Sequence, residues 1–140
     1  MIILVAFLII IFVVSCKKDT GTTDDSNSFN YKSLKGTWKC AETSLLLGKS
    51  TYTVTITVND STKNPPELYL KNVYQLGSNY VAILKILNST INIPYQIINN
   101  SNATIQGSGL LIPDLPQLKL TYIYTDRSDR DSVNAILTKM

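Results

Sequence analysis

The chain has 140 residues, of which 44% are hydrophobic and 16% are charged, and its formal net charge is +3. This length fits a single domain, and so small a net charge excludes the dense basic surface that nucleic-acid binding requires. The sequence contains no histidine, so it offers no Ser-His or Cys-His nucleophile and none of the usual zinc sites. We therefore expect a protein that is not an enzyme, with no metal, no cofactor and no nucleic-acid partner.

The first segment of the chain is an uninterrupted apolar run. Residues 2–14 are all apolar, and no charged side chain occurs before residue 17. A helix over these 13 residues would span roughly 20 Å, which is less than the hydrocarbon core of about 30 Å. The run therefore favours the hydrophobic region of a signal peptide over a transmembrane helix. A buried core element is the weaker alternative, because a polar segment follows at once.

The apolar run ends in Val13-Val14-Ser15-Cys16. These four residues are similar to the lipobox of bacterial lipoproteins. The resemblance implies that a diacylglycerol is attached to the sulfur of Cys16, that the chain is cleaved after Ser15, and that the new amine is acylated. Residues 1–15 would then be the signal peptide, and two or three acyl chains would hold the protein stably on a membrane.

The segment after Cys16 indicates where that membrane lies. Its first residues, Lys17-Lys18-Asp19, resemble the export signal of Bacteroidota surface lipoproteins. The resemblance implies anchoring in the outer membrane, on either its periplasmic or its cell-surface face. A solvated run of charges is the alternative. Residues 16–32 are rich in Ser, Thr, Asp and Asn, a composition that cannot bury enough apolar surface to fold. We expect a flexible tether here that reaches about 21 Å.

Residues 33–140 form the predicted domain. Apolar and polar residues alternate with period two, and turn residues interrupt the pattern at regular intervals, which indicates antiparallel strands. Pro94 falls inside one of these strands and predicts an edge or a bulge there. The fold class is therefore all-β, a single antiparallel eight-stranded meander, either a barrel or a β-sandwich. Two predicted strands contain Trp38 and Gly107; the others cover residues 51–58, 67–75, 80–87, 90–98, 117–125 and 132–139.

A second resemblance favours the barrel. Gly36-Thr37-Trp38 resembles the Gly-x-Trp opening of lipocalin-like barrels, and it implies that Trp38 closes one end of the barrel. Later segments are similar to small lipocalin-like lipoproteins of Bacteroidota; they are residues 103–109, 118–122 and 135–139. The resemblance spans most of residues 33–140.

Aromatic residues are the candidate ligand-binding residues. The alternation places Tyr52, Tyr95, Tyr122 and Tyr124 on the apolar faces of their strands, and Trp38 would lie at the base. Such a set could line a small apolar cavity inside the barrel. The alternative is that the rings fill the core. Cys40 shares a strand face with Trp38, so we expect it to be buried as a small apolar side chain.

The densest charge cluster is the run from Asp126 to Asp131. Its three carboxylates could offer oxygen ligands to Ca²⁺, but the glycine and the distal glutamate of calcium loops are absent. Three acids in one turn cannot flank a substrate from two sides, which excludes a glycosidase pair. We predict a solvated hairpin turn.

Two functional hypotheses remain. The first is a lipid-anchored, non-enzymatic binding module that holds a small apolar or amphiphilic ligand inside the barrel. The alternative is an accessory protein with a solid core, which contacts an envelope protein or a glycan through its surface.

Overall fold

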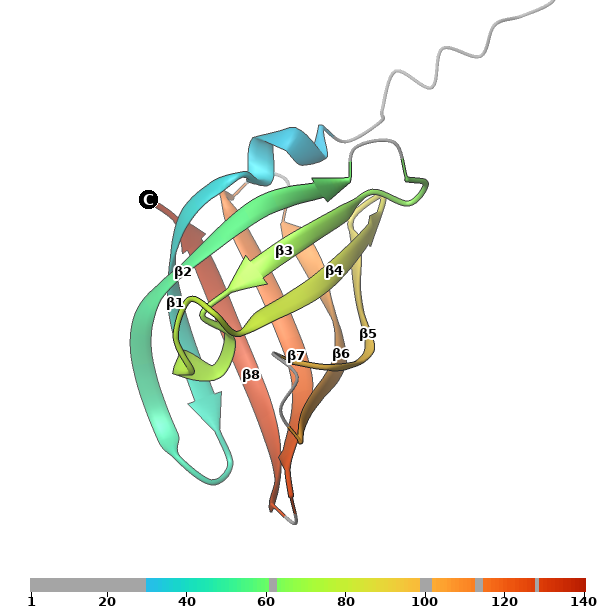
Figure 1. Ribbon diagram of the computed structural model, residues 1–140. Helices are drawn as coiled ribbons and strands as arrows, with labels where there is room; N and C mark the ends of the chain where they lie inside the picture. Colours follow the sequence, from blue (N-terminus) through green and yellow to red (C-terminus); the bar gives the residue numbers. More distant parts are fainter. Residues whose placement is uncertain (1–29, 61–62, 99–101, 113–114, 128) are drawn as a thin grey trace, which may run out of the picture.

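A computed structural model describes residues 30–60, 63–98, 102–112, 115–127 and 129–140. The predicted signal peptide, Cys16 and most of the tether lie outside these residues. Two 3₁₀ turns and eight strands follow one another along the described chain (Figure 1). In chain order they are η1 (Tyr31–Leu34), β1 (Gly36–Ser44), β2 (Gly48–Asp60), β3 (Glu67–Lys71), η2 (Val73–Gln75), β4 (Val81–Leu87), β5 (Thr90–Ile97), β6 (Ala103–Ile112), β7 (Gln117–Asp126) and β8 (Asp129–Lys139).

The strands form a closed antiparallel barrel in meander order. Each strand pairs with the next along the chain, and the last strand pairs with the first, from Trp38 opposite Lys139 to Ser44 opposite Val133. Closure gives each of the eight described strands two neighbours, so the sheet has no terminal strand that could pair with another chain. The predicted eight-stranded meander is therefore confirmed as a barrel, and the β-sandwich alternative is wrong.

Period-two alternation determines which side chains enter the barrel. In β8 the buried positions Val133, Ala135 and Leu137 alternate with exposed Asn134 and Ile136. An eight-stranded barrel has an interior just wide enough for side chains to fill. The inward apolar residues of the eight strands form one core cluster.

Trp38 lies at the end of the barrel where η1 is. Its indole Nε1 donates a hydrogen bond to the carbonyl oxygen of Leu34, at 2.9 Å, and both residues are buried. The ammonium of Lys139 lies 5.8 Å from the centre of the indole ring. The turns β1–β2 and β7–β8 lie at the opposite end, at the bottom of Figure 1.

The strands predicted over residues 67–75 and 90–98 are not regular along their whole length. The strand predicted over residues 67–75 ends at Lys71, because Asn72, Tyr74 and Gln75 adopt left-handed backbone angles that no strand can contain. The strand predicted over residues 90–98 has a bulge, since its pairing with β6 shifts between Ile93 and Gln96. Pro94 lies in this shift, as its missing N–H predicts.

Gly107 and Gly109 are needed where β6 approaches β7. A Cβ added to Gly107 would lie 2.3 Å from the carbonyl oxygen of Thr121 and 2.6 Å from the Cα of Tyr122. One added to Gly109 would lie 2.4 Å from the carbonyl oxygen of Lys119. Only glycine permits so close an approach between the two strands.

Candidate functional site

A buried carboxylate binds two tyrosine hydroxyls inside the barrel. Glu42 is 4% exposed, and its Oε2 accepts hydrogen bonds from the hydroxyls of Tyr52 at 2.6 Å and Tyr122 at 2.5 Å. The three residues come from β1, β2 and β7. These two hydrogen bonds give Oε2 partners inside the barrel and compensate for removing the Glu42 carboxyl group from water.

A second buried carboxylate, that of Asp131, lies at the end of the barrel opposite Trp38. Its Oδ2 accepts hydrogen bonds from the hydroxyls of Ser44 and Tyr74, the latter at 2.7 Å. Its Oδ1 accepts from the backbone amides of Leu45 and Leu46, at 2.9 and 3.1 Å. Asp131 thus connects β8 with the β1–β2 turn and with η2. The prediction that all acids of the 126–131 cluster are solvated is wrong for this residue, which is 1% exposed.

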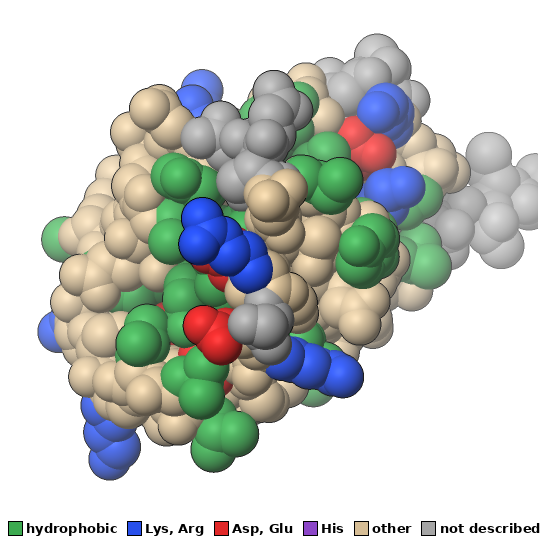
Figure 2. Space-filling model, turned by 60° about the horizontal axis from the view of Figure 1, so that its bottom comes forward, with side chains coloured by type: hydrophobic (Ala, Val, Ile, Leu, Met, Phe, Trp, Pro, Cys, Tyr) green, Lys and Arg blue, Asp and Glu red, His purple; other side chains and the backbone are tan. Residues whose placement is uncertain are grey.

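The same carboxylate fixes the backbone of an apolar turn. Leu45, Leu46 and Leu47 are 79%, 57% and 70% exposed. The amide of Leu47 donates to the hydroxyl of Ser44, so all three leucine amides have partners. Figure 2, in which this end of the barrel comes forward, shows hydrophobic side chains gathered on it.

Burial keeps the tyrosine hydroxyls and the thiol of the interior protonated. It raises the pKa values of Tyr52 and Tyr122, and the nearby Glu42 carboxylate raises both further. Burial also raises the pKa of the Cys40 thiol to about 12, although a hydrogen bond with Tyr52 opposes this effect. The two tyrosine hydroxyls therefore donate hydrogen bonds to Glu42 at neutral pH, and the protonated Cys40 thiol is a poor nucleophile.

Most of the predicted cavity-lining residues point inward. Trp38, Tyr122 and Tyr124 are buried, and Tyr52 packs against the core. These side chains belong to the apolar core of the barrel or pack against it. In the described residues, every buried side-chain nitrogen or oxygen atom has a hydrogen-bond partner. Cys40 is buried and free, which confirms that prediction.

Tyr95 is the exception, and its predicted place in the interior is wrong. Its side chain is 69% exposed on the outer wall of the barrel. The bulge at Pro94 is the cause, because one extra residue reverses the alternation, so that Ile91 and Ile93 are buried whereas Tyr95 and Ile97 are exposed.

The exposed Tyr95 ring borders two adjoining grooves on the outer wall. One groove, of about 410 Å³, has Pro94 and the backbone of Gly107 among its lining residues. The other, of about 280 Å³, extends to Arg130. Tyr95, Gln106 and Ile123 line both grooves. We call the two together the Tyr95 groove.

Neutral hydrogen-bonding side chains surround this ring. Asn92, Gln106 and Thr121 line one part of the Tyr95 groove, and Thr104 and Thr125 line the other. Arg130 is the one charged side chain among the described lining residues. An exposed aromatic ring among amides and hydroxyls is suited to a neutral, hydroxyl-rich ligand that is longer than a single ring.

Sequence reasoning did not find the Tyr95 groove, although one signal for it was available. Pro94 predicts a bulge, and a bulge turns the next residue to the other face. Applied to Tyr95, that rule would have moved the side chain from the interior to the outer wall. The grooves themselves depend on strand curvature and on Gly107, which alternation does not describe.

No family model matches the sequence, and no curated protein matches it. Neither of the two short helical turns within the described residues could cross a membrane.

Proposed function

We propose that this protein is a lipid-anchored accessory protein of the bacterial cell envelope, which contacts an envelope glycan through the outer wall of a solid barrel. The observation that carries the proposal is the Tyr95 groove. A sugar ring has an apolar C–H face, which packs on an aromatic ring, and peripheral hydroxyls, which pair with amides and hydroxyls. Tyr95 provides the ring, and Asn92, Gln106 and Thr121 provide the polar partners.

The proposed anchor is compatible with this arrangement. A diacylglycerol on Cys16 would attach the chain to the outer membrane, and the tether of about 21 Å would join it to η1. The tether would join the barrel at the η1 end, and the β7–β8 turn lies at the opposite end (Figure 1). Attachment at one end would leave the outer wall between the two ends accessible to the surrounding envelope.

The glycan contact is tested by measuring binding of neutral oligosaccharides to the full chain in detergent micelles. We expect Tyr95→Ala to weaken binding at least tenfold, which corresponds to about 1.4 kcal/mol. Tyr69→Ala is the matched control, because Tyr69 lies between the inward Leu68 and Leu70 of β3 and is absent from the Tyr95 groove. Equal binding by the Tyr95→Ala variant and the wild type would refute the glycan contact.

The anchor is tested separately by cell fractionation of a Cys16→Ser variant. The acyl chains account for membrane attachment in this proposal, so the variant should leave the membrane fraction and lose its lipid-dependent change in electrophoretic mobility. A variant that still sediments with membranes at unchanged mobility would contradict the anchor without affecting the glycan contact.

Binding of a small amphiphilic ligand inside the barrel is the second candidate function. The backbone of η2 supports it, since Asn72, Tyr74 and Gln75 are strained, and strain of this kind is frequent in segments that move to admit a ligand. Movement of Tyr74 would uncover the polar interior near Asp131. Uptake of a hydrophobic dye that increases in a Tyr74→Ala variant would favour this function, and absence of uptake in both proteins would exclude it.

A further inference from the structure

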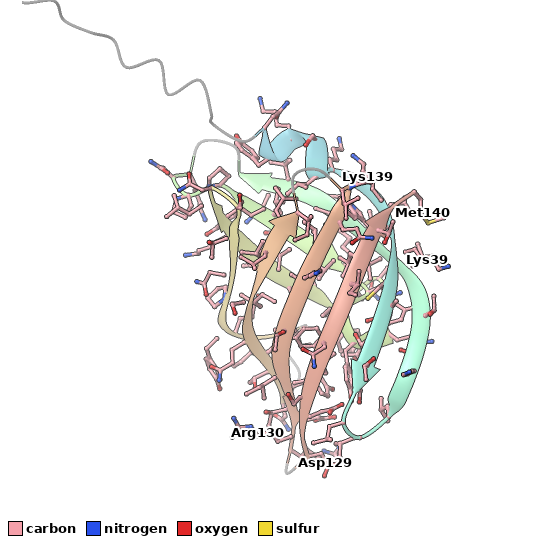
Figure 3. The ribbon with its side chains drawn as sticks, turned by 180° about the vertical axis from the view of Figure 1, so that it is seen from behind. Lys39, Asp129, Arg130, Lys139 and Met140 are labelled. Atoms are coloured by element: carbon pink, nitrogen blue, oxygen red, sulfur yellow. The ribbon has the colours of Figure 1, made fainter. Side chains whose placement is uncertain are left out.

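A third groove lies on the outer wall, over β2, β1, β8 and β7. Its volume is about 560 Å³. Figure 3 shows the barrel from behind, with β8 and its neighbours β7 and β1 toward the viewer. Lys49 from β2 and Lys119 from β7 line the groove together with hydroxyl and amide side chains, among them Thr43, Thr121 and Asn134. We call it the lysine groove.

Strand register places the two lysines at diagonally opposite corners of this groove. Lys49 pairs with Thr43, which pairs with Asn134, which pairs with Thr121. In the neighbouring row, Thr51, Ala41, Ile136 and Lys119 follow one another across the same four strands. With strands about 4.8 Å apart, the Cα atoms of the two lysines are separated by roughly 16 Å. That spacing suits an extended ligand with more than one charged group.

The two rows offer different contacts. One row presents the hydroxyls and the amide of Thr43, Asn134 and Thr121 between the corners. The other presents the small side chain of Ala41 beside Ile136, which is 44% exposed. The lysine groove therefore combines a polar strip with an apolar floor.

The charge of the lysine groove is not neutralised. The salt bridges of the described residues are those of Lys63 and Lys85 with Glu67, and neither Lys49 nor Lys119 takes part. Glu42 is the one acidic residue among the lining residues, and its carboxylate is directed into the barrel, where it binds Tyr52 and Tyr122. Two ammonium groups therefore face a groove that holds no opposing carboxylate.

We propose that the lysine groove binds an anionic oligosaccharide, with a sugar carboxylate or phosphate at each lysine and the intervening rings over Ala41 and Ile136. The inference rests on the proposed glycan-binding function and names the class of glycan. Thr121 lines both the lysine groove and the Tyr95 groove, so one chain can continue from one groove into the other. Two lysines are too few to hold a nucleic acid at physiological salt.

The test compares two forms of one ligand, an oligogalacturonate and its fully methyl-esterified form, on the full chain in detergent micelles. The two forms share every ring and differ in charge. We expect the acid form to bind at least tenfold more tightly at low salt, and added salt to remove that advantage. A Lys49→Gln/Lys119→Gln variant should bind both forms with the affinity that the wild type has for the ester.

A Lys32→Gln/Lys35→Gln variant is the matched control. It removes the same net charge from two exposed lysines at η1, outside the lysine groove, and it should keep the preference for the acid form. If the control loses that preference as well, general attraction explains it and the proposal falls. If anionic phospholipid vesicles bind through Lys49 and Lys119 and the acid oligosaccharide does not, the glycan class is wrong.

The two proposals fail in different ways. If both forms bind equally, and Tyr95→Ala weakens both while the lysine variant changes neither, the proposed glycan contact survives and the lysine groove has no part in it. If neither form nor any neutral oligosaccharide binds, the glycan function fails and this inference fails with it.

Discussion

Tyr74 and Asp131 are 57 positions apart in the sequence, and the hydroxyl of Tyr74 donates a hydrogen bond to the buried Asp131 carboxylate at 2.7 Å. The ring of Tyr74 also stacks on that of Tyr124, with centroids 4.1 Å apart and an angle of 20° between the rings. These two contacts hold η2 against the barrel although its backbone is strained at three residues. Contacts with residues that are distant in the sequence therefore compensate for the backbone strain of η2.

The first prediction separates the hydrogen bond from the stack. Tyr74→Phe keeps the ring on Tyr124 and removes the donor to Asp131, so we expect the free energy of unfolding to fall by about 1–2 kcal/mol. Urea denaturation measures this change. Tyr95→Phe is the control, because the exposed Tyr95 hydroxyl should contribute less than about 0.5 kcal/mol. A loss of the same size in both variants would show that the bond to Asp131 contributes nothing specific.

The second prediction concerns stability in acid. Burial alone would raise the pKa of Asp131, but hydrogen bonds from Ser44, Tyr74 and the amides of Leu46 and Leu45 outweigh it and hold the pKa below its usual value. A carboxyl whose pKa is lower in the folded state stabilises the protein fully above the unfolded value of about 3.9. That contribution disappears as the pH falls through the folded-state pKa.

Asp131→Asn should therefore cost about 2–3 kcal/mol at pH 7 and progressively less below about pH 4. Urea denaturation at a series of pH values measures the difference between the variant and the wild type. Glu67 also contributes to the loss of stability in acid, because the hydrogen bond from Lys63 lowers its pKa. Its contribution is therefore measured separately. The Glu67→Gln variant should keep the part of the acid dependence that Asp131 supplies. A constant difference between Asp131→Asn and the wild type at all pH values would contradict the assignment.

The barrel could be predicted because one rule acts on every strand. A side chain in a closed eight-stranded barrel points either into the core or toward solvent, so alternation such as Val133, Ala135, Leu137 shows directly which face is inside. Counting back by two from Val133 along β8 places Asp131 on the same inward face. The same count along β1 places Glu42 on the inward face with Trp38 and Cys40. Alternation alone would therefore have placed Glu42 and Asp131 inside the barrel, although the predicted hairpin turn assigned Asp131 to solvent.

Their partners could not be predicted. The bond from Tyr74 to Asp131 depends on η2, whose left-handed residues have no local sequence signal such as glycine. The contact of Glu42 with Tyr122 depends on the register by which β8 connects β1 to β7. Pairing across a closed barrel is a property of the whole chain, whereas alternation is a property of one strand.

The third prediction tests the close approach of β6 to β7. Gly107→Ala would bring a methyl group against the carbonyl of Thr121 and the Cα of Tyr122. Backbone cannot yield as a flexible side chain can, so we expect a loss of about 1–3 kcal/mol or more in the free energy of unfolding. Ser108→Ala is the matched control, because the neighbouring Ser108 is exposed and should change stability by less than about 0.5 kcal/mol. Equal thermal midpoints for the two variants would contradict the prediction.

The fourth prediction concerns the reactivity of Cys40. Its thiol is 2% exposed, and burial raises its pKa to about 12, so about one molecule in ten thousand carries the reactive thiolate at pH 8. In a Cys16→Ser background, where Cys40 is the remaining cysteine, we expect a disulfide reagent to modify the native protein only as fast as the protein unfolds. Adding Ala41→Cys provides an internal control, because residue 41 is exposed on the outer wall and a thiol there should have a pKa near the ordinary value of about 8.5. That protein should react in two phases, a fast one for residue 41 and a slow one that denaturant accelerates. A single fast phase for both thiols would contradict the prediction. It would mean that the barrel opens often, although β8 is paired with both β1 and β7.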